Sequence, residues 1–109
     1  EKADLISQIK QVADKKAGFS PTAKAFKRDA QQAYGVILLY YKGIGANHSA
    51  GMKYLKTAAK SNPTKSFIST YQIGHRAYKG IDQQINLSTA ANWMIKSYEA
   101  VQERQRKTL

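Results

Sequence analysis

The side chains best suited to catalysis or metal binding are few and far apart in the sequence. His48 and His75 are the two histidines, and the chain has no cysteine to complete a zinc site beside them. Catalysis commonly needs a nucleophile beside a base, or two carboxylates in one cleft. The acidic residues are scattered, and Glu99 with Glu103 fits a solvated helix face on which Lys107 pairs with Glu103. We therefore expect a protein that is not an enzyme and uses no metal or cofactor.

Two short motifs invite a ligand-binding interpretation that their context does not favour. Gly43-Ile44-Gly45 has the first glycines of a dinucleotide-binding fingerprint, but His48 occupies the place of the third and a predicted helix precedes the motif. These glycines are better explained as residues that end a helix and reverse the chain. Asn47 and Asn86 each begin an Asn-X-Ser glycosylation pattern, which helix capping explains without sugar.

Charge is the most unusual property of the composition. The chain has 18 basic and 7 acidic residues in 109, a formal net charge of +11. This excess favours an acidic partner, such as an acidic protein, nucleic acid, an anionic membrane surface or a cell-wall polymer, unless the charge serves only solubility. An apolar content of 42% indicates a folded chain, and the longest apolar run, Val36 to Tyr41, is far too short to span a membrane.

Apolar residues recur at helical spacing in five segments, and few β-branched clusters support strands. Ser20-Pro21, Asn47 and Asn86 are predicted helix N-termini, because such side chains accept hydrogen bonds from first-turn amides. The predicted helices cover residues 3–16, 21 to about 42, 48 to about 60, 63–78 and 87 onward. Since Val36 to Tyr41 is apolar all round its helix, Leu38 or Leu39 must contact either the first helix or a partner.

The stretch Tyr41-Lys42-Gly43-Ile44 returns as Tyr78-Lys79-Gly80-Ile81, a shift of 37 residues, whereas Asn47 and Asn86 are 39 apart. A helix–turn–helix unit with this period is typical of α-solenoids. We expect one domain, residues 1–109, with an N-terminal capping helix (3–18), a first repeat (20–62), a second repeat (63–101) and a polar tail (102–109).

These residues resemble the Sel-one-like repeats, relatives of the tetratricopeptide repeats. The second copy supplies Ile73-Gly74, Tyr78, Gly80, Ala90 and Trp93 of the family pattern, and the first supplies Ala33, Tyr41, Gly43, Gly45, Tyr54 and Ala58-Ala59. The resemblance covers about residues 30 to 100 and implies a tetratricopeptide-like superhelix of paired antiparallel helices. It also implies that Tyr41, Tyr54, Tyr78 and Trp93 lie in the core.

The chain departs from the family pattern at several positions. Ile37 stands where the family has its helix glycine, Asp82 replaces the second turn glycine, and Ser97-Tyr98 replaces Ala-Ala. Such departures indicate divergent or terminal repeats. In the fifth predicted helix, periodicity places Tyr98 on the buried side with Leu87, Ala90, Ala91, Met94 and Val101.

In solenoids the first helix of each pair lines the concave docking surface. With Ala33, Val36, Ile37, Tyr40 and Tyr41 assigned to the core, the helices of residues 21–42 and 63–78 turn a basic, mildly apolar ridge outward. We expect this ridge to bind an acidic protein, with Leu38 as apolar anchor and basic side chains as hydrogen-bond donors. The predicted contact residues are Arg28, Gln31, Leu38, Lys42, Lys65, Gln72, His75, Arg76 and Lys79.

The resemblance suggests a bacterial scaffold, either an inhibitor (immunity protein) of a secreted toxin or an assembly factor of the envelope or secretion machinery. It suggests the periplasm or cell envelope after signal removal, with the cytoplasm as the alternative. The alternative function is nucleic-acid binding through Lys53, Lys56 and Lys60 and the basic tail, which would show a steep salt dependence. An aromatic platform for such binding would draw on Tyr34, Tyr40 and Tyr71.

Overall fold

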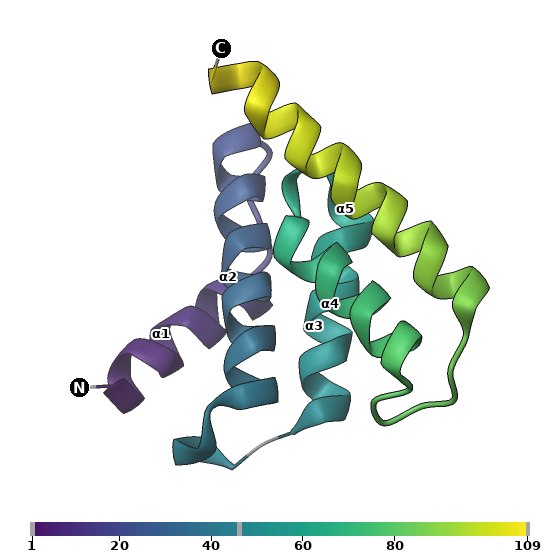
Figure 1. Ribbon diagram of the computed structural model, residues 1–109. Coiled ribbons are helices and arrows are strands. Elements are labelled where there is room, and N and C mark those ends of the chain that lie inside the picture. Colours follow the sequence, from purple (N-terminus) through teal and green to yellow (C-terminus); the bar gives the residue numbers. More distant parts are fainter. Residues whose placement is uncertain (1, 46, 109) are drawn as a thin grey trace. The chain divides into compact units, whose positions relative to one another are not determined.

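The computed structural model describes residues 2–45 and 47–108, and within these ranges every regular element is helical. The elements, in chain order, are α1 (Lys2–Asp14), α2 (Pro21–Tyr40), η1 (Lys42–Ile44), α3 (His48–Ser61), η2 (Pro63–Lys65), α4 (Phe67–Lys79) and α5 (Leu87–Thr108) (Figure 1). The predicted all-α class with five helices is therefore confirmed. No helix in the described part of the chain is long and apolar enough to cross a lipid bilayer.

Three predicted helix starts are confirmed by their hydrogen bonds. The Ser20 hydroxyl accepts from the Ala23 amide at 3.0 Å, and Pro21 follows at the first helical position. The side-chain oxygen of Asn47 accepts from the Ala50 amide at 3.1 Å, and that of Asn86 accepts from the Thr89 amide at 3.0 Å. Each cap satisfies one first-turn amide that has no partner inside its own helix.

The chain divides into two compact units, one ending at Ala58 and one beginning at Ala59. In the first unit, α1 packs across α2 (Figure 1) and contributes Ala13 to a core with Ala30, Tyr34 and Leu38. Half-buried apolar side chains surround this core: Ile6, Ile9, Val12, Ala50 and Tyr54. The first helix is therefore the contact that the apolar run of α2 required.

In each unit a glycine lets two helices approach closely. A Cβ atom on Gly35 of α2 would lie 2.8 Å from Leu55 Cδ2 and 2.9 Å from the Gly51 carbonyl oxygen of α3. In the second unit, α4 and α5 lie side by side (Figure 1), and a Cβ on Gly74 would lie 3.2 Å from the Met94 side chain and 3.3 Å from a backbone carbonyl oxygen of α5. At the contact between α2 and α3, only glycine fits without displacing backbone atoms.

These contacts repeat at a shift of 39 residues. Gly35, Gly51 and Leu55 correspond to Gly74, Ala90 and Met94. The Asn47 amide likewise donates to the Leu38 carbonyl at 2.9 Å, and 39 residues later the Asn86 amide donates to the Ala77 carbonyl at 3.0 Å. We call α2 with α3 the first hairpin and α4 with α5 the second. The helix glycine of the first hairpin is therefore Gly35, and its assignment to the position of Ile37 was wrong.

The twin Tyr-Lys-Gly-Ile stretches have different backbones. Helix α2 ends at Tyr40, and Tyr41 is extended, so the predicted end near Lys42 lies two residues too late. Helix α4 instead continues to Lys79 and ends on Gly80 in the left-handed region, with φ of 70°. Both connections, 41–47 and 80–86, have seven residues, but Tyr41 follows the end of α2 whereas Tyr78 and Lys79 still belong to α4. The repeated stretch therefore lies two residues earlier relative to the helix end in the second copy, which accounts for identical residues at a shift of 37 and equivalent packing at 39.

Candidate interaction surfaces

The predicted ridge draws on both units, and its members differ in exposure. On α2 and η1, Lys42 is exposed and Arg28 half-buried, but Gln31 and Leu38 are buried. Leu38 lies in the core with Ala13 of α1 and is not an exposed anchor. The predicted rotation of α2 was wrong because α1 and α3 both cover the side of α2 that carries Gly35 and Leu38, whereas Ala33 and Tyr40 are exposed.

In the second unit Lys65 and Lys79 are exposed, Gln72 and His75 are half-buried, and Arg76 is buried. Arg76 is not a surface donor, because its side chain is only 4% exposed and its Nη2 donates to Asp82 Oδ2 at 2.8 Å. Its backbone carbonyl also accepts from the Ile81 amide at 3.0 Å. Arg76 therefore holds the α4–α5 turn from inside.

Asp82 occupies the turn position of Gly45 in the first copy. Both residues have positive φ, 77° for Gly45 and 57° for Asp82. Aspartate tolerates this region better than most side chains, and here its carboxylate is also used to pair with Arg76. Positive φ is thus common to the two turn positions.

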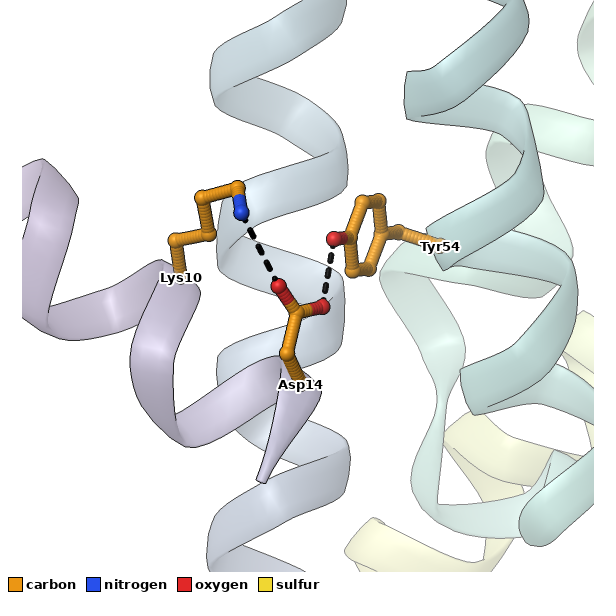
Figure 2. Close-up of polar contacts among 3 residues, drawn as sticks. All are labelled: Lys10, Asp14 and Tyr54. Carbon is orange, nitrogen blue, oxygen red and sulfur yellow. Dashed lines mark hydrogen bonds and ion pairs between the residues drawn. The ribbon is translucent and has the colours of Figure 1, made fainter. Parts of the chain in front are cut away.

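A polar cluster joins α1 to α3 in the first unit (Figure 2). Figure 2 shows the Tyr54 hydroxyl donating to Asp14 Oδ1 at 2.5 Å and the Lys10 ammonium bonding Asp14 Oδ2 at 3.1 Å. The Tyr54 ring also meets Tyr34 edge-to-face, with centroids 4.9 Å apart. Both carboxylate oxygens of Asp14 are therefore engaged.

The cluster is unsuited to acid–base chemistry near neutral pH. The hydrogen bond from Tyr54 is the main cause that lowers the pKa of Asp14, and burial, with Asp14 beside it, raises the pKa of Tyr54 to about 12. Asp14 thus stays ionised and Tyr54 stays protonated. An open hollow of about 310 Å³ adjoins them, lined also by Gln31, Lys53 and Thr57. We interpret the cluster as a structural bridge.

No metal-binding group stands out in residues 2–45 and 47–108, where no three His, Asp or Glu side chains gather closely enough to hold an ion. The lysines of the alternative nucleic-acid surface, Lys53, Lys56 and Lys60, are all exposed along α3. Residues 102–108 of the predicted polar tail form the last turns of α5. There Glu103 lies 3.8 Å from Arg106 and 3.7 Å from Lys107, the second being the predicted ion pair.

The aromatic side chains of the second hairpin lie differently from the prediction. Tyr78 is 55% exposed and Tyr98 is 64% exposed, so their assignment to the core was wrong. Tyr54, Tyr41 and Trp93 are half-buried, and Tyr34 is buried. Apolar periodicity identified the helices correctly but wrongly placed Tyr98 on the buried side of its helix, and the family resemblance wrongly placed Tyr78 in the core.

Tyr71 extends this exposed aromatic surface along α4. Its ring stacks on Phe67, with centroids 6.1 Å apart, and on His75, with centroids 5.6 Å apart. The Lys79 ammonium lies 5.6 Å from the centre of the Tyr78 ring. Ile95 and Leu87 are exposed on α5. Of these aromatic and aliphatic residues, only Tyr71 was predicted to be available for contact, because apolar periodicity gives no signal for the exposure of the others.

Comparison with known proteins adds no assignment: no protein family, no curated protein and no solved structure matches this chain.

Proposed function

We propose that the chain is a non-enzymatic protein-interaction scaffold, built from two divergent repeats of the Sel-one-like, tetratricopeptide-like kind, that binds an acidic protein. The observation that carries the proposal is the recurrence of one helix contact, Gly35 against Leu55 and Gly74 against Met94. In repeat proteins such hairpins stack into a superhelix whose surfaces bind partners. The recurrence at 39 residues favours this arrangement over an unrelated helical bundle.

The basic excess supports an acidic partner. Lys42, Lys65 and Lys79 of the predicted ridge are on the surface, as are the α3 lysines. Exposed cations of one sign speed encounter with an acidic protein and select against basic ones. The roles that fit are an immunity protein for a secreted toxin and an assembly factor of the envelope or secretion machinery.

The test is capture with the immobilised full chain from a nuclease-treated extract of the cells that make it, followed by identification and calorimetry of the purified complex. We expect an acidic protein that binds at a 1:1 ratio with a Kd of about 1 μM or tighter, weakened at least severalfold by 0.5 M salt. Capture that depends on nucleic acid, together with tight binding of random duplex DNA at low salt, would instead establish the alternative carried by Lys53, Lys56 and Lys60.

A further inference from the structure

The second hairpin exposes tyrosines that directly follow buried residues. Tyr71 follows the buried Thr70, Tyr78 follows the buried Ala77, and Tyr98 follows the buried Ser97. We define the tyrosine face as Tyr71 and Tyr78 of α4 with Leu87, Ile95 and Tyr98 of α5. All five side chains are between 41% and 64% exposed.

These side chains share one side of the α4–α5 pair. One residue along an α-helix is a rotation of about 100°. Tyr71 and Tyr78, three residues before and four after Gly74, are therefore rotated from that contact residue in the same sense, by about 60° and about 40°. On α5, Tyr98 is four residues after the contact residue Met94 and is rotated from it by about 40° in the same sense. Because α4 and α5 run antiparallel, the same rotation on both helices leads to the same side of the pair. Along α5, spacings of eight and three residues keep Leu87, Ile95 and Tyr98 on a single stripe.

The positions of the first hairpin that correspond to the three tyrosines are buried. At the shift of 39, Tyr71, Tyr78 and Tyr98 correspond to Gln32, Leu39 and Ala59. Leu39 is 3% exposed and Ala59 is fully buried, and Gln32 is also buried. At these three positions the first hairpin is therefore packed, whereas the second exposes larger aromatic residues.

We propose that the tyrosine face is the docking surface of the scaffold and that it binds an amphipathic helix of the partner, acidic along the flank that faces Lys79. The inference rests on the proposed function and names the site and the kind of segment that it takes. Two antiparallel helices present a groove between their ridges, which suits a third helix. Tyrosine suits such a surface because its ring packs while its hydroxyl remains hydrogen-bonded to water or to the partner.

The basic charge around the tyrosine face favours an acidic helix as the bound segment. Lys79 places a cation over the Tyr78 ring at the α4 edge of the face. From Ala59 to Thr108 the sequence has eight basic residues and three acidic ones, and Asp82 and Glu103 of those three already pair with basic side chains. A second copy of a chain with net charge +11 would bring like charges together, so self-association is the less favoured occupant.

The probe is a synthetic amphipathic helical peptide of about 20 residues, with leucines at i, i+3, i+4 and i+7 spacing and glutamates on its flanks. A second peptide of the same pattern carries lysines in place of the glutamates. Each is titrated into the ¹⁵N-labelled full chain and followed by amide chemical shifts. We expect the acidic peptide to shift amides of residues 67–79 and 87–98 and to bind at least tenfold more tightly than the basic one.

Variants locate the site. The double variant Tyr78→Ser/Tyr98→Ser should weaken the acidic peptide at least tenfold, and Lys79→Glu should weaken it severalfold. Phe19→Ser, which removes an aromatic ring that is 97% exposed outside the face, should change the Kd less than twofold. Unchanged helical spectra and melting temperatures establish that the variants are folded, which their exposed positions favour.

Several results would overturn this inference: equal affinity for the two peptides, shifts confined to α3, or no shifts at millimolar peptide. If the chain forms a dimer in solution and the tyrosine variants dissociate it, the face binds a second copy of the chain and not a partner helix. If the captured protein of the preceding section binds the double variant as tightly as the unmodified chain, the docking site is wrong while the scaffold function stands. If the peptide binds at the face but the extract yields no protein partner, the scaffold function fails by itself.

Discussion

The hydroxyl of Tyr54 in α3 donates to the carboxylate of Asp14 at the end of α1, 40 residues earlier in the chain, over 2.5 Å (Figure 2). This hydrogen bond links the N-terminal helix to the first hairpin. It forms beside the packing of Ala13 with Leu38, so polar and apolar contacts hold α1 at the same place.

Replacing Tyr54 by phenylalanine tests this tie. The ring would still meet Tyr34 edge-to-face, and only the hydrogen bond to a carboxylate would be lost. Because the site is partly open to solvent, we expect the free energy of unfolding to fall by about 1 kcal/mol, measured by urea denaturation. Tyr98→Phe is the matched control, since Tyr98 is mostly exposed, and it should change stability by less than about 0.5 kcal/mol. Equal effects of the two substitutions would contradict the bridge.

Acid should remove the contribution of Asp14 to the free energy of unfolding. Its folded-state pKa is lowered below the usual 3.8, so the ionised form stabilises the fold above that pH and the stabilisation disappears as pH falls through the folded-state pKa. Asp14→Asn keeps the shape but not the charge. We expect the unmodified chain to be the more stable of the two from pH 5 to 7, and the difference in unfolding free energy to shrink below about pH 4. A difference that stays constant down to pH 2.5 would argue against it.

Much of the fold could be predicted because its signals are local. Ser20, Asn47 and Asn86 mark helix starts by a hydrogen bond within three residues, and apolar spacing marks the helices between them. Packing register is less accessible, because the most alike stretches, around Tyr41 and Tyr78, lie at different places relative to the helix ends: Tyr41 follows α2, whereas Tyr78 lies inside α4. Gly35 and Gly74 are the equivalent positions in the two helix–helix contacts. A lone glycine in a helix is nevertheless a weak signal until the residue packed against it is known.

Alanine at the two helix glycines should therefore have unequal effects. Alanine at either position gains about 1 kcal/mol of helix propensity. At Gly35 the new methyl group would meet the Gly51 carbonyl oxygen at 2.9 Å as well as Leu55, and we expect a net loss of about 1–3 kcal/mol. At Gly74 the nearest atom belongs to Met94, a flexible side chain that can move, so the net change should be within about 1 kcal/mol. Thermal unfolding of both variants measures this, and a larger loss for Gly74→Ala would contradict the packing.

The candidate surface was predicted less well than the fold, for a physical reason. Helical periodicity marks the apolar run around Leu38, and the family pattern placed Tyr78 in the core. Neither signal shows how many neighbours each side of a helix receives. Leu38 is covered because α1 packs on α2, whereas Tyr78 remains exposed on the hairpin that has no equivalent cover. Arg76 was predicted as a surface cation from the assumed rotation of its helix. A buried arginine is rare without a partner, and the partner of Arg76, Asp82, lies across a turn six residues later.

Asp82→Asn tests that buried pair. Asparagine has nearly the same shape and also tolerates positive φ, so the substitution removes the charge while keeping the backbone conformation. Arg76 would then be a buried cation without its carboxylate, and its Nε already has no hydrogen-bond partner in the described residues. Because Asp82 is itself half-exposed, we expect a loss of about 1–2 kcal/mol rather than the 3–5 kcal/mol of a fully buried pair. Arg76→Met provides the other side of a double-mutant cycle by denaturation, and a coupling energy near zero would show that the two side chains act independently.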